Sequence, residues 1–475
     1  MNASQRVVIG VDSSTQSTKA VAVDIDSGEV LAEGRAAHTV TGTGGARESD
    51  PQQWWQAFTE AVAATGHADR ALAVAVGGQQ HGLVALDADG TPVHPAMLWN
   101  DTRSAPQAAA LTERLGRAEW ARRTGSVPTA AFTVAKWAWL RENAPEAAER
   151  TAAVRLPHDY LTGRLTGAGT TDRGDASGTG WWGENGYDKE ILDLVGLDEG
   201  RLPEVIEPGH AAGTVRPGSP LPAGIPVAAG TGDNMAAALG LGLTPGLPAL
   251  SLGTSGTVYA VTRGRPADES GIVAGFADAS GGWLPLACTL NCTLAVDRIA
   301  ALLGRDRADV EPGGTAVVLP FLDGERTPDL PYSSGLFHGL RHDTTAGQLL
   351  QAAYDGAAHA LLTALDDVLR HGGETSSDAP ILLIGGGARG TAWQNTVRRL
   401  SGRAVQLPRA AELVALGAAA QAAGLVTGEE PAEVARRWGT ADGPLLDPLP
   451  RDEEALERIA DTLHRAGRLF EAPTR

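Results

Sequence analysis

Two segments of the sequence share one pattern: an apolar strand, a short turn of Thr, Ser and Gly, and a second apolar strand. The first is VVIGVDSSTQSTKAVAVD, at 7–24, and the second is LSLGTSGTVYAV, at 250–261. Thr15 and Thr18 of the first align with Thr254 and Thr257 of the second. Turns of small hydroxylated residues present backbone N–H groups and hydroxyls that suit phosphate oxygens. The repeat therefore predicts a duplicated architecture that holds a phosphate group between two hairpins.

Size, charge and cysteine content narrow the class of protein. The chain has 475 residues, enough for two or three domains, and a net charge of -18. A field of that sign repels nucleic acid and anionic membrane surfaces, although local N–H groups can still neutralise a small anion such as ATP. Cys288 and Cys292 are predicted to be reduced core thiols. The N-terminus lacks a basic region followed by a long apolar segment, and Gln421 interrupts the longest Ala-rich run, so we expect a cytoplasmic protein.

Strand and helix signals alternate after each hairpin, which predicts an α/β fold. In the first half, Asp50 is predicted to cap a helix that starts at Pro51, and a buried strand follows at 71–76. In the second half, helices are expected at 348–370 and 391–400, with a strand at 380–384 between them. Thr244-Pro245-Gly246 breaks the chain, and we place the domain boundary there. The predicted domains are 1–245 and 246–475, with a cleft between them.

The turn of the first hairpin carries the groups expected to hold a triphosphate. Lys19 can add a point charge, and Asp12, at the end of a strand, can hold a hydrated Mg²⁺. A polar hairpin turn without a ligand is the alternative interpretation, and the downstream repeat favours phosphate binding. No Gly-Lys dipeptide occurs in the sequence, which excludes a P-loop enzyme.

Asp233 follows a strand, lies beside glycines and opens a helix in GTGDNMAAALG. It can be a helix N-cap, or a carboxylate at the mouth of a cleft that accepts a proton from a substrate hydroxyl during phosphoryl transfer. The loop Gln79-Gln80-His81-Gly82 follows a buried strand, and its polar groups suit hydrogen bonds to a polyol. These segments predict a binding site for a small hydroxylated substrate.

The glycine run in ILLIGGGARGTAWQN allows two interpretations. Gly385, Gly387 and Gly390 match the G-x-G-x-x-G pattern of dinucleotide-binding folds, with Glu412 about 20 residues further on. A glycine-rich turn between a strand and a helix also allows a close approach to adenosine or phosphate. A dehydrogenase therefore remains the rival hypothesis.

In their order along the chain, the motifs resemble the carbohydrate-kinase family that contains glycerol kinase, gluconate kinase, ribulokinase and xylulokinase. The resemblance covers nearly the whole chain, through GGQQHG, MLWNDTRS, LPHDYLTGRLTG, FLDGERTPDL and LVALGAAAQAA as well as the segments above. It implies two ribonuclease-H-like domains of the actin and hexokinase type, with ATP and Mg²⁺ in the cleft between them. Within the family the chain is most similar to xylulokinases, so D-xylulose is the implied sugar.

The resemblance also implies roles for individual residues. Asp233 would be the catalytic base, and Asp12 would lie on the side of the metal. The implied sugar ligands are Gln80, His81, Asp233 and Asn234, and the implied nucleotide ligands are Thr15, Ser17, Lys19, Thr254, Gly386, Gly387 and Ala388. The sequence departs from many relatives at Ser14, where Gly is frequent, and at Gln80, where xylulokinases often have Met.

The implied partners are a small sugar and ATP, with no nucleic acid or membrane, and relatives suggest a homodimer. Other acceptors, namely ribulose, xylitol, gluconate or glycerol, remain alternatives. A chaperone-like or filament-forming ATPase on the same scaffold is a third class of function. The polar GGQQHG loop and the lack of a peptide-binding extension argue against it.

Overall fold

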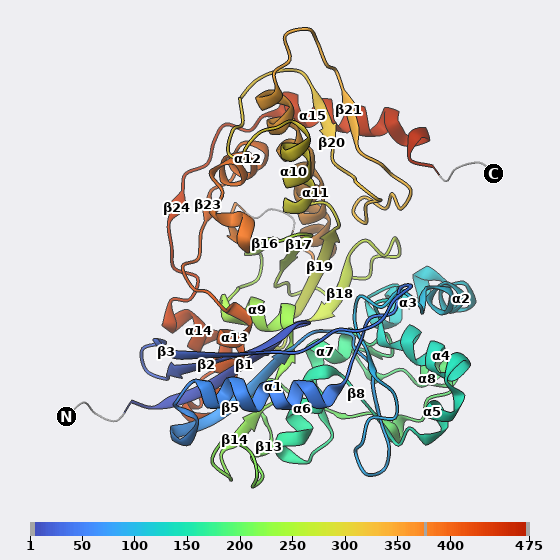
Figure 1. Cartoon of the computed structure of the whole chain (residues 1–475), viewed down its shortest axis with the longest axis vertical. Helices are drawn as coiled ribbons and strands as arrows, with labels where there is room; N and C mark the ends of the chain where they lie inside the picture. Colours follow the sequence, from blue (N-terminus) through green and yellow to red (C-terminus); the bar gives the residue numbers. More distant parts are fainter. Residues whose placement is uncertain (1–4, 375–377, 472–475) are drawn as a thin grey trace.

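Two seven-stranded sheets organise the chain in the computed structural model, which describes residues 5–374 and 378–471 (Figure 1). The first sheet has the order β13-β14-β5-β1-β2-β3, with β15 paired to β5, and the second has the order β18-β19-β17-β16-β22-β23-β24. The strands of the first sheet are β1 (Val7–Ser13), β2 (Ser17–Asp24), β3 (Val30–Ala37), β5 (Ala71–Gly78), β13 (Ala211–Thr214), β14 (Pro226–Ala228) and β15 (Thr231–Gly232). Those of the second are β16 (Pro248–Leu252), β17 (Gly256–Ala260), β18 (Ala274–Ala277), β19 (Trp283–Thr289), β22 (Ile381–Ile384), β23 (Val405–Gln406) and β24 (Leu445–Leu446).

Both sheets pair their strands in the same way around the two hairpins. β1 pairs antiparallel with β2 and parallel with β5, and β16 pairs antiparallel with β17 and parallel with β22. The second hairpin strand of each sheet pairs antiparallel with one more strand, β3 in the first sheet and β19 in the second. The strand pairing confirms the duplicated architecture that the sequence repeat predicts.

The helices of the first half form two groups. α1 (Pro51–Ala64), α6 (Pro157–Thr166) and α9 (Asp233–Gly240) pack close to the first sheet, and the Asp50 side chain caps α1 by accepting a hydrogen bond from Gln52 N at 2.9 Å, as predicted. The others are α2 (Ala105–Leu115), α3 (Arg117–Thr124), α4 (Thr133–Asn143), α5 (Pro145–Arg150), α7 (Arg173–Ser177) and α8 (Lys189–Val195).

The helices of the second half range in length from eight to 26 residues. They are α10 (Thr293–Leu302), α11 (Ala346–His371), α12 (Thr391–Ser401), α13 (Leu413–Thr427), α14 (Pro431–Trp438) and α15 (Glu453–Ala466). The predicted helices at 348–370 and 391–400 correspond to α11 and α12, and the strand predicted at 380–384 corresponds to β22. Among the described residues, no helix is long and apolar enough to cross a membrane.

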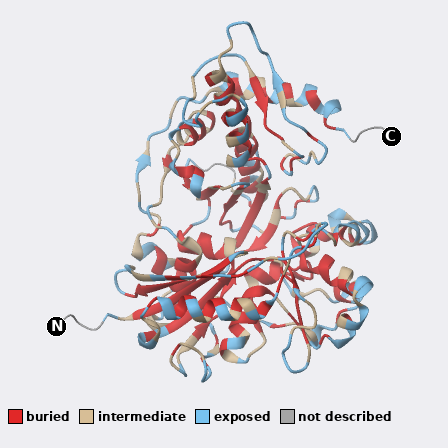
Figure 2. Cartoon of the chain, viewed as in Figure 1, coloured by how far each residue is buried: buried red, intermediate tan, exposed pale blue. Residues whose placement is uncertain are grey.

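Short strand pairs complete the fold. They are β4 (Glu48–Ser49) with β7 (Ala96–Met97), β6 (Val84–Leu86) with β8 (Ala153–Arg155), β9 (Thr170–Asp172) with β12 (Glu204–Ile206), β10 (Trp182–Gly183) with β11 (Gly186–Tyr187), and β20 (Val317–Leu319) with β21 (Leu336–His338). Buried residues concentrate on the strands of both sheets and on the inner sides of the helices (Figure 2).

Both faces of β1 are buried, which explains why the strand is apolar without alternation. Val7 and Ile9 belong to a core cluster with side chains of α1 and α6, such as Phe58, whereas Val8 belongs to a cluster with side chains of α13, such as Ala419. Thus α13, from the second half of the sequence, covers one face of the first sheet, as Figure 1 shows. The two sheets divide between β15 and β16, and the division into domains 1–245 and 246–475 stays a prediction.

Glycines allow α13 to lie unusually close to its neighbours. A Cβ atom at Gly10 of β1 would lie 2.0 Å from the carbonyl oxygen of Ala415, and one at Gly417 would lie 1.9 Å from that of Ala236 in α9. These distances leave no room for any side chain larger than hydrogen. The small residues of α13 are therefore required by its position between the sheet and α9.

A substitution at this contact tests the packing. We expect Gly417→Ala to destabilise the folded chain by about 3 kcal/mol, because a methyl group would overlap a backbone carbonyl that cannot move aside. Differential scanning calorimetry measures the change as a lower unfolding temperature. Gly467→Ala is the matched control, because a Cβ atom there meets no atom within 4 Å. Equal unfolding temperatures for the two variants would contradict the prediction.

Candidate active site

A cleft of about 970 Å³ is lined by residues from both halves of the chain. The hairpin of the first sheet contributes residues on one side, and the turn after β22 contributes residues on the other. The predicted site residues in its lining are Asp12, Lys19, Asp233, Asn234, Gly386 and Ala388. The structure thus brings the predicted metal side, catalytic carboxylate and nucleotide turn into one cleft.

Strand pairing explains why Asp12 and Asp233 meet. Asp12 lies near the end of β1, opposite Gly77 of the parallel strand β5, and Asp233 directly follows β15, which pairs with the last residues of the same strand. The carboxyl ends of parallel strands share one edge of a sheet, which is where ligands bind in α/β folds. Both carboxylates therefore lie at the same edge.

Asp12 is a buried carboxylate with a polar neighbour. Its side chain is buried, and the Ser14 hydroxyl lies 2.7 Å from each of its two carboxylate oxygens. Burial raises the pKa of Asp12 to about 6, although the Ser14 hydrogen bond and the Lys19 charge act in the opposite direction. A positive charge brought to Asp12 would restore its ionised form.

Asp233 is the first residue of α9, and Gly232 is the N-cap, so the interpretation of Asp233 as the capping residue is wrong. Its Oδ1 accepts hydrogen bonds from the backbone N of Asn234 at 2.8 Å and from Asn234 Nδ2 at 3.0 Å. Burial raises the pKa of Asp233 to about 7, and the carboxylates of Asp12 and Asp175 add to the rise. A carboxylate with a raised pKa is a stronger proton acceptor.

One predicted sugar ligand, Asn234, contacts this carboxylate and links it to a second, Gln80. Asn234 Nδ2 also donates to Gln80 Oε1 at 2.8 Å, which joins the loop after β5 to the start of α9. His81 adopts a left-handed backbone conformation, with φ of 64°, which is rare for a residue other than glycine. Strained backbone of this kind occurs at functional sites.

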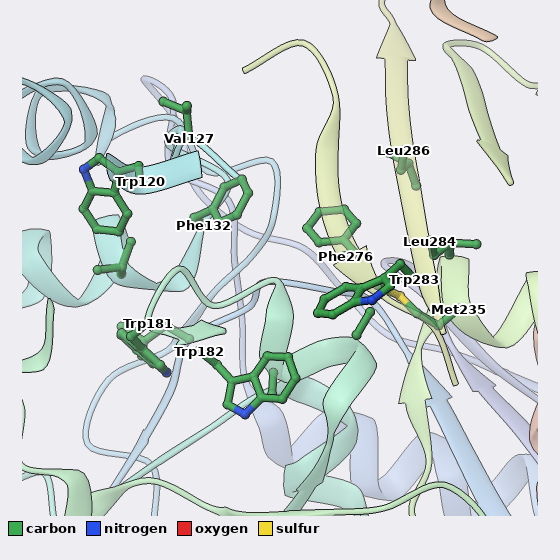
Figure 3. Close-up of a cluster of buried hydrophobic side chains, with 14 of the residues drawn as sticks. Trp120, Val127, Phe132, Trp181, Trp182, Met235, Phe276, Trp283, Leu284 and Leu286 are labelled. Atoms are coloured by element: carbon green, nitrogen blue, oxygen red, sulfur yellow. The ribbon is translucent and has the colours of Figure 1, made fainter. Parts of the chain in front are cut away.

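The tautomer of His81 follows from its contacts. Its Nδ1 lies 2.7 Å from the carbonyl oxygen of Gly178, which can only accept, so Nδ1 carries the proton. Burial lowers the pKa of His81 to about 3, so the ring is neutral and its Nε2 is an acceptor. The ring packs against Phe132 and Phe276, whose centroids are 5.0 and 5.4 Å away. Figure 3 shows these two phenylalanines within a cluster of buried hydrophobic side chains. His81 can therefore accept a hydrogen bond from a hydroxyl group.

Lys19 has a partner that the sequence did not suggest for it. Its Nζ lies 2.5 Å from Oε2 of Glu412, whose backbone is left-handed with φ of 51° at the start of α13. The two side chains are about one quarter exposed, at 28% and 24%. The cation that is predicted to hold phosphate thus shares the cleft with a competing carboxylate.

Other predicted nucleotide ligands lie outside the lining of this cleft. Thr15 Oγ1 accepts a hydrogen bond from the indole N–H of Trp99 at 3.1 Å, Ser17 is buried, and Thr254 is exposed at the turn of the second hairpin. Gly387 lines a neighbouring pocket of about 500 Å³. Their roles as ligands stay predictions.

The cleft also contains residues that sequence reasoning missed. Arg389 and Arg409 line it, and they follow the parallel strands β22 and β23, whose ends share one edge. Tyr259 lines it too, and its buried hydroxyl lacks a hydrogen-bond partner among the described residues. The segment that follows a parallel strand is a signal that could have identified the arginines.

The residues present fit a magnesium ion that a nucleotide helps to hold. Within 5–374 and 378–471, no group of three or more His, Cys, Asp or Glu side chains could hold a metal ion alone. Mg²⁺ commonly binds one or two carboxylates together with phosphates and water. The buried Asp12 carboxylate, beside Lys19 in the cleft, suits that kind of site.

Comparisons with known proteins match nearly the whole chain. The N-terminal domain of the FGGY family of carbohydrate kinases matches residues 7–240, and the C-terminal domain of that family matches residues 249–425. The chain is 68% identical over 474 residues to the xylulose kinase of Streptomyces rubiginosus, and the alignment covers 98% of each chain.

Solved structures share the fold. The xylulose kinase of Bifidobacterium adolescentis has a TM-score of 0.87 and 36% identity, over 97% of this chain and 100% of that chain. The gluconate kinase of Lactobacillus acidophilus has a TM-score of 0.90 and 20% identity, over 99% of each chain, and shows the fold alone. The matches confirm the expected two-domain fold of the actin and hexokinase type.

A charge substitution tests the phosphate side of the cleft. We expect Lys19→Met to weaken ATP binding about tenfold. In the original chain the Lys19 ammonium would leave Glu412 and pair with the triphosphate, and the variant has no cation at this position. Isothermal titration calorimetry measures the dissociation constant. Arg6→Met is the control, because it removes a cation that pairs with the exposed Asp26. Unchanged ATP affinity in Lys19→Met would exclude a phosphate contact for this residue.

Proposed function

The chain belongs to the FGGY family of carbohydrate kinases, and we propose that it transfers the γ-phosphoryl group of ATP to a hydroxyl of D-xylulose. The observation that carries the proposal is the place of Asp233. Its carboxylate contacts Asn234, which bonds Gln80 on the sugar side, and it shares one cleft with Asp12 and Lys19 on the phosphate side. The high identity to a xylulose kinase supports D-xylulose as the acceptor.

Asp233 acts as the general base in this proposal. The sugar hydroxyl donates a hydrogen bond to its carboxylate, the hydroxyl oxygen bonds to the γ-phosphorus, and the proton passes to Asp233 while ADP leaves. A raised pKa keeps the carboxylate basic enough to accept that proton near neutral pH. Because the transition state is loose, most of the rate enhancement comes from positioning and charge stabilisation.

The sugar is held by neighbours of Asp233. Gln80 and Asn234 are already joined by a hydrogen bond, so their remaining polar atoms have defined directions. Gln80 Nε2 is buried without a partner among the described residues, which suits a hydroxyl oxygen of the ligand. His81 accepts a hydrogen bond from a sugar hydroxyl at Nε2, because Nδ1 already donates to the carbonyl oxygen of Gly178.

The nucleotide lies along the two hairpins and the glycine turn. Its phosphates are bound by Thr15, Ser17, Lys19 and Thr254, and Gly386, Gly387 and Ala388 line the rest of its site. When bound at Asp12, Mg²⁺ supplies positive charge that neutralises the phosphate oxygens. The pocket beside Gly387 is lined by Tyr354 and Trp393 and meets the main cleft at Arg307, so it offers apolar surface to the adenine base.

The rival hypotheses lose their support. The glycine pattern that allowed a dehydrogenase lies within the match to the carbohydrate-kinase C-terminal domain, at residues 249–425. A chaperone-like ATPase does not need the polar groups of Gln80, His81 and Asn234 around Asp233. A homodimer and a cytoplasmic location complete the proposal, and both stay predictions.

Replacing the proposed base separates chemistry from binding. We expect Asp233→Asn to lower kcat for D-xylulose at least 100-fold, because the amide cannot accept the hydroxyl proton, while ATP affinity changes less than about twofold. A coupled ADP-release assay and calorimetry measure the two quantities. Asp26→Asn, at an exposed position, is the control. Near-normal turnover by the Asp233→Asn variant would show that Asp233 is not the general base.

The choice of acceptor needs its own measurement. We expect kcat/KM for D-xylulose to exceed that for L-ribulose, xylitol, gluconate and glycerol by at least tenfold, because a polar site rejects substrates that leave its buried groups unpaired. The same ADP-release assay over the five compounds gives the ratios. A higher kcat/KM for another compound would reassign the substrate and leave the phosphoryl chemistry in place.

A further inference from the structure

A buried cluster of one imidazole and three carboxylates lies outside the lining of the cleft. His158 Nδ1 is 2.8 Å from Asp175 Oδ2, and His158 Nε2 is 3.3 Å from Asp159 Oδ1 and 3.7 Å from Asp172 Oδ1. At most 3% of any of these side chains is exposed. Burial of so many ionisable groups lowers the stability of the fold, whereas apolar residues of similar size in the same place would not lower it. The cluster therefore calls for a role other than stability.

The cluster is held together by charge. Burial alone would lower the pKa of His158, but the Asp159 and Asp175 carboxylates outweigh burial and raise it to about 9. The ring is therefore an imidazolium: its Nδ1 donates to Asp175 Oδ2, whereas its Nε2 lies near the Asp159 and Asp172 carboxylates without a hydrogen-bond partner among the described residues. One side chain of α6 thus fixes residues at the end of β9 and in α7.

His158 also touches both strand ends that carry the site. A Cβ atom at Gly78, the last residue of β5, would lie 3.0 Å from the Cβ of His158. One at Gly230, just before β15, would lie 2.8 Å from His158 Cδ2. Gly78 leads into Gln80 and His81, and Gly230 leads into Asp233. His158 therefore packs against the backbone of both segments, through its main chain and Cβ at Gly78 and through its ring at Gly230.

One arm of the cluster reaches Asp233 through a hydroxyl group. Thr231 Oγ1 donates to Asp172 Oδ2 at 2.7 Å, and Thr231 lies two residues before Asp233. The same carboxylate caps α7 by accepting from Gly174 N at 2.8 Å and Asp175 N at 3.0 Å. Asp172 thus ties β15, the strand that leads into Asp233, to the first turn of α7.

The other arm reaches His81 through the end of α7. Asp175 lies in this helix, and its backbone oxygen accepts from Gly178 N at 3.0 Å. The carbonyl oxygen of Gly178 accepts from His81 Nδ1 at 2.7 Å. A Cβ atom at Gly178 would lie 2.7 Å from that nitrogen, so the ring lies directly against the helix end. The place of α7 therefore sets the direction of His81 Nε2.

We propose that His158, Asp172 and Asp175 are positioning residues that hold the base Asp233, through Thr231, and the sugar ligand His81, through Gly178, in one fixed relation. None of the three touches the substrate. The proposal rests on the proposed function, because it assumes that Asp233 and His81 meet the same sugar. The proposal explains why the chain keeps these buried charges although they cost stability: they fix the geometry of the catalytic groups. A displacement of such groups by about 1 Å can reduce the rate about 100-fold.

The hydroxyl of Thr231 allows a test that leaves the charged cluster intact. In the full-length enzyme we expect Thr231→Val to lower kcat for D-xylulose about tenfold or more, with the KM for ATP changed less than about twofold. Thr231→Ser keeps the hydroxyl and should restore kcat to within about threefold of the original chain. Thr151→Val is the matched control, because Thr151 is equally buried and its hydroxyl donates to Ala147 O at 2.8 Å, a helical carbonyl away from the site.

A second variant tests the arm that leads to His81. We expect His158→Gln to lower kcat and also to raise the KM for D-xylulose at least threefold, because both Asp233 and His81 lose their support. The Thr231 series decides the proposal even if His158→Gln fails to fold. Equal kcat values for Thr231→Val and Thr151→Val would overturn the positioning role. Sugar-dependent ADP release by the original chain would uphold the proposed function in that case. Absence of that release in the original chain would overturn the proposed function itself.

Discussion

The close contact of α13 with β1 and α9 is the constraint on which the rest of the structure depends. Glycine at Gly10 and Gly417 lets the helix backbone approach to distances that any Cβ would prevent. The contact brings a segment from the second half of the chain onto the first sheet, and it places Glu412, at the start of α13, beside Lys19. Residues 407–414 thereby become one wall of the cleft. The close packing of backbones, rather than an attraction between charges, therefore forms this wall of the cleft.

Buried carboxylates give the cleft its chemistry. Asp12 and Asp233 lie at one edge of the first sheet, where burial raises the pKa of each, and the Asp175 carboxylate adds to the effect at Asp233. Such groups bind a cation or accept a proton more readily than exposed ones. Lys19, Arg389 and Arg409 supply the opposite charge in the same cleft, so a nucleotide can bind to a chain whose net charge is -18. Local charge, rather than net charge, governs this ligand.

Much of this arrangement could be predicted from particular segments. The repeated hairpins predicted a duplicated architecture, and the structure has the same strand pairing around both hairpins. Asp12, Lys19, Asp233 and Asn234 were expected in the cleft that they line. The ion pair between Lys19 and Glu412 was not predicted, because its members are 393 residues apart and no local pattern relates them. The buried His158 cluster was also missed, because no local pattern relates its members although they lie at most 17 residues apart. Periodicity reports which face of an element is buried, and it is silent on which distant element covers that face.

The sequence by itself determined the elements and the kinds of chemical group at their ends. Apolar runs, caps and glycine turns are local properties, and the order of the motifs identified the family. The tertiary structure alone decided which of these groups meet. It directed Nδ1 of His81 to Gly178, joined Thr231 to Asp172, and raised the pKa of Asp233 by burial. Direction, pairing and desolvation depend on atoms that are distant in sequence, so they arise only when the chain has folded.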